Sequence, residues 1–141
     1  MYLHDWKDGG FIDMVGDFEG IYIDAEEYYS TKSPYANVEY WIDRKQKMTD
    51  ALASDKWKNM EVLLASYNYE DHSGDAFVLF KRDGKLYEVN GSHCSCYCLE
   101  DQWEPEETTI ESLRHRLYKG NLGSYEYNMF SDELRQVLDS L

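Results

Sequence analysis

The clearest periodic pattern of hydrophobic positions follows Ser33-Pro34, a pair typical of a helix start. Mostly apolar side chains then recur every three or four residues, as on one face of an amphipathic helix. They are Val38, Trp41, Ile42, Lys45, Met48 and Leu52. Arg44 and Lys47 fall on or near the polar side. The pattern predicts a helix over about 35–53.

Alternating and continuous apolar runs next predict an antiparallel meander over about 61–98. The expected strands are EVLLASYNY, AFVLFKR and KLYEV, at 61–69, 76–82 and 85–89. The turn-rich stretch EDHSGD joins the first two, and Asp83-Gly84 is a strong hairpin signal between the second and third. Asn90-Gly91 predicts another turn, after which SHCSCYC begins a fourth strand.

Two more helices are expected near the C-terminus, over about 109–119 and 132–140. Thr108 with Glu111 forms a capping box for the first, and Ser131 caps the second. The glycine-rich residues 1–23 predict loops with one short strand at most, and the capping pattern at 24–27 predicts a single helical turn. The chain is thus predicted to be one α+β domain, 1–141, with a small antiparallel sheet and about three helices.

Charge narrows the range of functions. The 141 residues carry a formal net charge of -14, from 28 acids and 14 bases. Residues 1–30 hold eight acids and one lysine, and residues 91–107 hold five acids and no base, whereas residues 31–60 have a net charge of +2. An anionic surface repels nucleic acid and acidic lipids, so we expect no direct binding to nucleic acid or membranes.

The three cysteines stand at alternate positions in the stretch SHCSCYC. In a strand, Cys94, Cys96 and Cys98 would share one face and His93 would point to the other. Three thiolates with a distant histidine are a conceivable zinc site, but structural zinc usually takes pairs spaced by two to four residues. We favour small buried side chains instead, and expect no metal and no cofactor. The odd cysteine count and the polar start of the chain predict a reduced, cytoplasmic setting without a signal peptide.

The run from Gly74 to Thr109 resembles a family of small uncharacterised bacteriophage proteins. The recognisable part is GKLYEVNGSHCSCY followed by LE and QW, and Cys98 stands where the family pattern has glycine. That difference makes a shared three-cysteine zinc site less plausible. The resemblance transfers no activity, but it implies a phage accessory protein acting in the cytoplasm of a bacterial host.

Together these features lead to a hypothesis of function. A folded surface of carboxylates can compete for the basic channel of a nucleic-acid-binding protein, and aromatic side chains can anchor it. We therefore expect an inhibitor of a host defence or nucleic-acid-handling protein, such as a CRISPR effector or a restriction enzyme. The expected acidic surface comprises Asp13, Asp17, Glu19, Asp24, Glu26, Glu27, Glu100, Asp101, Glu104, Glu106 and Glu107, with Tyr28, Tyr29 and Trp103 as anchors.

Two alternatives remain open at this point. One is a protein that sequesters a small ligand such as a nucleotide signal, for which the clustered cations are Arg44, Lys45, Arg114 and Arg116. The other is a small metal- or thiol-dependent enzyme built on His93, Cys94 and Cys96. The common phosphate-loop, zincin, dinucleotide and nucleophile-elbow motifs are missing from the sequence, so neither alternative has a motif to support it.

Overall fold

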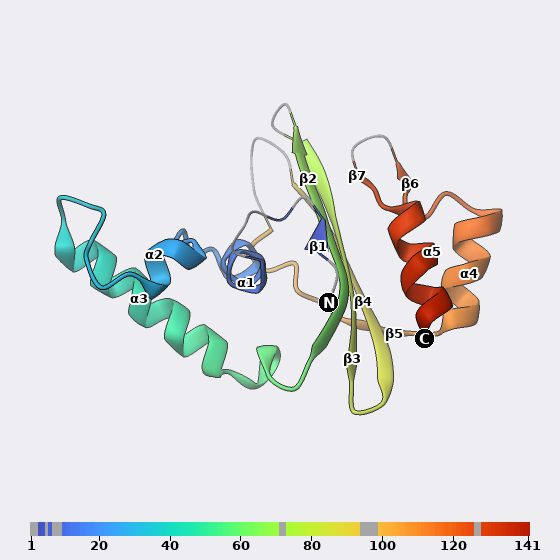
Figure 1. Cartoon of the computed structure of the whole chain (residues 1–141), viewed down its shortest axis with the longest axis horizontal. Coiled ribbons are helices and arrows are strands. Elements are labelled where there is room, and N and C mark those ends of the chain that lie inside the picture. Colours follow the sequence, from blue (N-terminus) through green and yellow to red (C-terminus); the bar gives the residue numbers. More distant parts are fainter. Residues whose placement is uncertain (1–2, 5, 7–9, 71–72, 94–98, 126–127) are drawn as a thin grey trace.

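The computed structural model describes residues 3–4, 6, 10–70, 73–93, 99–125 and 128–141. At its centre is a five-stranded sheet in the order β1-β2-β3-β4-β5 (Figure 1). The strands are β1 (Leu3–His4), β2 (Glu61–Glu70), β3 (Ser73–Arg82), β4 (Lys85–His93) and β5 (Glu106–Thr108). The two-residue β1 pairs with β2 in parallel, and all other pairs are antiparallel. The α+β class and its antiparallel meander are therefore confirmed.

Helices cover both faces of this sheet (Figure 1). They are α1 (Phe11–Glu19), α2 (Ala25–Tyr29), α3 (Val38–Ala53), α4 (Ile110–Lys119) and α5 (Ser131–Ser140), with a short 3-10 helix η1 (Asp55–Trp57). The first three lie on one side, and α4 and α5 on the other, beside the small hairpin of β6 (Ser124–Tyr125) and β7 (Asn128–Met129). The N-terminal half of α3 extends well beyond the sheet.

Within the described part of the chain, no helix is both long and apolar enough to span a bilayer.

Strand β3 contributes side chains to two hydrophobic cores, one on each face of the sheet. Val78 and Phe80 face the core formed with α1, η1 and the 99–103 segment, whereas Phe77 and Leu79 face the core formed with α4 and α5. All four side chains are almost completely buried. A central strand covered on both faces reads as a continuous hydrophobic run rather than an alternating one.

Helix α1 corrects the prediction of loops over residues 1–23. Its buried residues Ile12, Val15 and Phe18 keep helical spacing, but the glycines around them obscured the pattern. Gly16 lies inside the helix. The position requires glycine because a β-carbon there would be 2.7 Å from the carbonyl oxygen of Ile21. Gly20 ends the helix in the left-handed conformation at φ +71°, where glycine is favoured.

The turn predicted at Asn90-Gly91 is also wrong, because β4 continues through it to His93. Gly91 serves close packing rather than a turn, since a β-carbon there would lie 3.2 Å from the Leu99 side chain. Ser92 and His93 thus extend an existing strand, and the predicted fourth strand beyond them, over Cys94, Cys96 and Cys98, lies outside the described residues. In the same way, most of the stretch predicted to link β2 and β3 belongs to the two strands.

The helix starts differ from the predicted ones by one to three residues. Asn37, not Ser33, caps α3 by accepting the N–H of Tyr40 at 3.1 Å. Thr109, not Thr108, caps α4 through the N–H of Ser112, and α5 begins at Ser131 without a side-chain cap. The single turn α2 is confirmed, with the Asp24 side chain accepting the N–H of Glu27 at 2.8 Å.

The hairpin between β3 and β4 supports a stability prediction. Asp83 and Gly84 both have positive φ, +53° and +77°, as a type I′ turn requires. A side chain at Gly84 would meet no atom within 4 Å, so any cost of adding one is conformational. We expect Gly84→Val to lower the free energy of unfolding by about 1 kcal/mol or more, and Gly84→Asn by less. Urea unfolding with equal midpoints for both variants and the parent would contradict this.

Candidate partner-binding face

Carboxylates of the N-terminal acidic block meet at a cavity of about 180 Å³ between α1 and α2. The cavity, called the acidic cavity below, is lined by Asp13, Asp17, Ile21, Tyr22, Ile23, Asp24, Glu27 and Tyr35. Helix α1 directs Asp13 and Asp17 to one side because they are four residues apart. Helix α2 supplies Glu27 and its capping residue Asp24. The fold thus gathers four acids that the sequence only placed in the same block.

A tyrosine at the rim of the acidic cavity is tied to one of these acids. The hydroxyl of Tyr35 donates a hydrogen bond to Glu27 Oε2 at 2.7 Å. This bond to a carboxylate, with smaller effects from burial and neighbouring negative charge, raises the pKa of Tyr35 to about 12. The phenol therefore stays protonated and acts as a donor at neutral pH.

The second acidic block reaches the first one through Glu100. The hydroxyl of Tyr22 donates to Glu100 Oε1 at 2.5 Å, across 78 positions of sequence. Gly20 permits this approach, since a β-carbon there would lie 2.7 Å from the Cγ of Glu100. Asp101, the next residue, is exposed. The two acidic blocks are therefore neighbours in space at this point.

The 99–103 segment is held in place by the sheet and the core. The side-chain amide of Gln102 makes the pair of hydrogen bonds to β4 that the backbone of a neighbouring strand would make. It accepts the N–H of Ser92 at 2.8 Å and donates to the Ser92 carbonyl at 2.7 Å. Leu99 is fully buried next to it. These contacts fix Glu100 and Asp101 relative to α1. We call the resulting surface the acidic face; it comprises Asp17, Asp24, Glu27, Glu100 and Asp101.

The remaining acids of the second block diverge from this face. Glu104 is exposed just before β5. Glu106 and Glu107 lie on β5 opposite Glu88 and Tyr87, so their side chains point to opposite faces of the sheet. Glu106 is close enough to Arg116 of α4 to raise its pKa, although Glu88 has the larger effect. The predicted surface is therefore divided rather than continuous.

Three residues expected on the partner-binding surface serve the interior instead. Asp13 is only 4% exposed, at the inner wall of the acidic cavity. Glu19 accepts hydrogen bonds from Trp57 Nε1 at 2.7 Å and from Lys56 Nζ at 3.0 Å. Trp103 is buried, with its ring centre 4.2 Å from that of Trp57, so its assignment as a surface anchor is wrong.

The other aromatic assignments fall on α2. Tyr29 is 73% exposed, whereas Tyr28 is half-buried with its hydroxyl hydrogen-bonded to Thr49 of α3 at 2.9 Å. Tyr22 and Tyr35, which the sequence interpretation did not select, are exposed at the edges of the acidic cavity. Their proximity to Glu100 and Glu27 could not be inferred from local spacing. The acidic face is thus bordered by tyrosines.

The four cations considered for a small-ligand site do not form one cluster. Arg44 and Lys45 lie on α3, where they stack over the rings of Tyr40 and Trp41. The two arginines of α4 lie on the opposite side of the sheet, as Figure 1 shows. Arg114 pairs with Asp139 at 3.0 Å, and Arg116 pairs with Glu88. The geometry therefore offers no common anion pocket built from these four residues.

The proposed metal ligands are almost entirely outside the described part of the chain. Cys94, Cys96 and Cys98 lie in the segment that is not described, and only the backbone of His93 is described, at the end of β4. Among the described residues, no group of three or more His, Cys, Asp or Glu side chains is arranged to hold a metal ion.

Comparison of the chain with protein-family models, with curated proteins and with solved structures found no match. The proposals below therefore rest on the geometry and charge of this chain, and only their phage context comes from the sequence resemblance described above.

Proposed function

We propose that this protein is a phage accessory protein that binds a host protein through its acidic face and occupies the partner's nucleic-acid-binding surface. The target class is a host defence or nucleic-acid-handling protein, such as a CRISPR effector or a restriction enzyme, in the bacterial cytoplasm. The observation that carries the proposal is the Tyr22–Glu100 hydrogen bond, because it joins two acidic blocks far apart in sequence.

The chemistry of the face suits a basic partner. A DNA duplex presents about one negative charge per 1.7 Å of axis, and the proteins that bind it neutralise several phosphates with lysines and arginines. Asp17, Asp24 and Glu27 line one cavity on this face. Exposed carboxylates individually contribute little, so such a surface acts collectively and is sensitive to salt.

The tyrosines add short-range contacts to this long-range attraction. Tyr22 and Tyr29 are more than half exposed, at 57% and 73%, and border the acidic residues of α1 and α2. Tyrosine side chains are enriched among the residues that dominate binding energy at protein interfaces. A surface that combines carboxylates with tyrosines is suited to a basic protein surface with apolar gaps.

The proposal is tested by neutralising four acids of the acidic face. The quadruple variant carries Asp24→Asn, Glu27→Gln, Glu100→Gln and Asp101→Asn, and its new amides can still accept the α2 cap and Tyr35 hydrogen bonds. Asparagine tolerates the positive φ of Asp101 (+63°), and the amide oxygen that replaces the Glu100 carboxylate still accepts from Tyr22. We expect affinity for a partner captured from bacterial lysate and then purified to fall on the order of 100-fold, since each exposed charge contributes up to about 1 kcal/mol.

A matched control changes the net charge equally on the other side of the sheet. It neutralises four acids of α4 and α5: Glu111, Asp132, Glu133 and Asp139. The control should retain affinity, and the parent should release the partner at high ionic strength and compete with duplex DNA for it. Equal loss in both variants, or binding indifferent to salt, would refute the proposed function.

A further inference from the structure

A cavity of about 230 Å³ lies between the sheet and the loop 121–123 that follows α4. One wall consists of residues of β3 and β4, and the other of this loop together with Phe130. Three of the lining residues, Asp75, Asn90 and Asn121, carry polar side chains, and most of the others are apolar. We call it the sheet cavity. A mostly apolar cavity with a few converging polar groups is the usual form of a small-molecule site.

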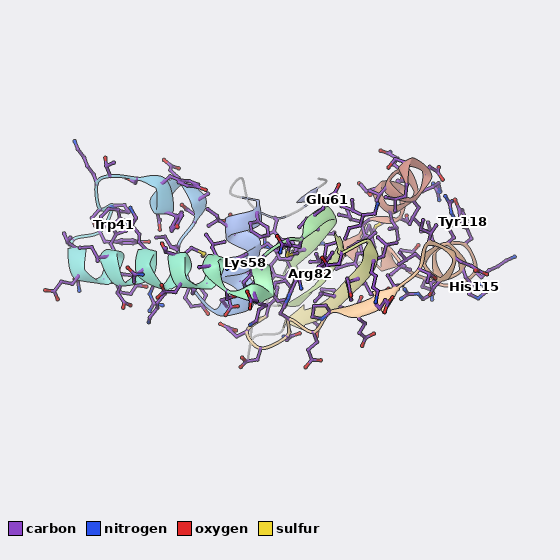
Figure 2. The ribbon with its side chains drawn as sticks, turned by 90° about the horizontal axis from the view of Figure 1, so that it is seen from below. Trp41, Lys58, Glu61, Arg82, His115 and Tyr118 are labelled. Carbon is purple, nitrogen blue, oxygen red and sulfur yellow. The ribbon has the colours of Figure 1, made fainter. Side chains whose placement is uncertain are left out.

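The register of the sheet places three of the lining side chains on one face. Phe77 packs in the core formed with α4 and α5. Asn90 is the cross-strand partner of Phe77, and Asp75 precedes Phe77 by two residues, so both share its face. Helix α4 covers this side of the sheet and turns His115 and Tyr118 away from it (Figure 2). Beyond Phe77 the two strands continue past the helices, and the loop 121–123 faces them there.

Contacts within the fold fix the loop wall of the sheet cavity. The carbonyl of Gly123 accepts the N–H groups of Phe130 and Ser131, both at 3.0 Å. Gly123 has φ +78°, and a β-carbon there would lie 2.8 Å from the nitrogen of Ser131, so the position requires glycine. The ring of Phe130 stacks on that of Phe77, with 4.6 Å between ring centres. The loop and the sheet are therefore held together, and the cavity is preformed.

The amide of Asn90 is oriented by a buried ion pair. Its Nδ2 donates to Glu88 Oε1 at 3.0 Å, and Glu88 is itself bound by Arg116 of α4. An ionised carboxylate only accepts hydrogen bonds, so the amide nitrogen must be the atom that faces Glu88. This bond uses one of the two amide hydrogens and leaves one N–H and the oxygen Oδ1 for a ligand. Such a donor and acceptor side by side match N7 and the N6 amine of adenine.

The other polar groups of the sheet cavity agree with a neutral amino-bearing ligand. Asn121, on the loop wall, supplies a second carboxamide that can accept the other hydrogen of an amine. Asp75 brings a negative charge, and the described residues that line the cavity include no lysine or arginine. Arg116 reaches this region only through its pairing with Glu88. A phosphate would be repelled there, so a base or nucleoside fits better than a nucleotide.

We propose that the sheet cavity binds the adenine base of a neutral nucleoside. Asn90 accepts the N6 amine through Oδ1 and donates its remaining amide N–H to N7, while Asn121 accepts the second amine hydrogen. Ala76 and Leu122 provide apolar contact for the ring, as in other sites that hold a single base. The inference uses neither the acidic face nor the four cations considered for a nucleotide signal, so it does not rest on the proposed function.

The test is an NMR titration of the isotope-labelled protein with adenosine, inosine and adenosine monophosphate. Inosine keeps N7 but carries an oxygen in place of the amine. We expect adenosine to shift the backbone amide signals of Gly91, Leu122 and Gly123, and to bind at least about 10-fold more tightly than inosine, because a bidentate amide contact discriminates between bases by this much or more. The monophosphate should bind more weakly than adenosine because its charge meets Asp75.

Three variants locate the contacts. Asn90→Ala should lose the preference for adenosine over inosine, and Asn121→Ala, on an exposed loop, should weaken adenosine binding without changing the fold. Asn59→Gly changes an exposed asparagine outside the cavity, at a positive φ that glycine tolerates, and should behave as the parent. If Asn90→Ala fails to fold because Glu88 loses a donor, Asn121→Ala decides the result.

Several results would overturn the inference. They are adenosine at millimolar concentration shifting no signals, shifts confined to other segments, equal binding of adenosine and inosine, or a folded Asn90→Ala variant that keeps the preference. None of these results bears on the acidic face. Conversely, the quadruple variant of the acidic face should bind adenosine as the parent does, so the two proposals fail separately.

Discussion

Replacing Arg116 by methionine is expected to lower the free energy of unfolding by about 3 kcal/mol, because it leaves the carboxylate of Glu88 buried without its cation. Glu88 is 4% exposed on β4, and Arg116 of α4 binds both of its oxygens. The side chain of Arg116 is itself 39% exposed, so water partly compensates and the loss should lie at the lower end of the range for buried pairs. Urea unfolding followed by circular dichroism measures the change.

Two companion variants make this expectation specific. Arg114→Met removes a neighbouring arginine whose partner, Asp139, is exposed, and should cost at most about 1 kcal/mol. The double variant Glu88→Leu with Arg116→Met should recover much of the lost stability, because no charge is then buried. If Arg116→Met and Arg114→Met have the same effect, the buried pair is not a major contributor.

The Glu88–Arg116 pair should also make the free energy of unfolding fall in acid. Burial alone would raise the pKa of Glu88, but hydrogen bonds from Arg116, Thr108 and Asn90 outweigh it and hold the pKa below its ordinary value of 4.5. The stability it contributes is therefore complete above 4.5 and lost as the pH falls through the lower folded pKa. Glu88→Gln, compared with the parent by urea unfolding across this range, should show a shallower decline in acid.

Replacing Trp103 by alanine is the second change with a large expected effect. The indole packs against Trp57, Phe18 and Phe80, with ring centres 4.2, 4.9 and 5.6 Å away. Removing a buried tryptophan typically costs about 3–5 kcal/mol, and thermal unfolding should reveal a loss of this size. Trp103→Phe keeps most of the apolar contact and should cost clearly less.

This variant also distinguishes a core residue from a binding anchor. Loss of Trp103 would release the 99–103 segment, so Glu100 and Asp101 would no longer be fixed beside Tyr22. We therefore expect weaker partner binding together with lower stability. Weaker binding at unchanged melting temperature would instead restore Trp103 as a surface anchor and contradict the buried position.

Local chemistry in the sequence was sufficient for several elements. The Asp83-Gly84 turn, the α2 cap at Asp24 and the periodic apolar positions of α3 all depend on residues within a few positions of one another. Turn type, capping and helical periodicity are short-range properties, so their signals survive without knowledge of the fold. The excess of acids in two blocks was equally visible.

The tertiary structure alone decided how these pieces combine. Gly16 and Gly91 looked like breakers, yet each lies within a regular element: the carbonyl of Ile21 leaves no room for a β-carbon at Gly16, and the side chain of Leu99 packs closely on Gly91. Trp103 became a core residue because Trp57 and α1 cover it.

For the candidate site too, the sequence predicted the residue types and the tertiary structure decided which of them meet. The sequence by itself determined that acids and tyrosines are abundant, but the Tyr22–Glu100 contact joins positions 78 residues apart. The exposure of Val38 and Ile42 likewise depends on α3 extending beyond the sheet, although their spacing predicted burial. Periodicity identifies the positions that share a helix face, whereas only the packing of the other elements determines which of those faces is covered.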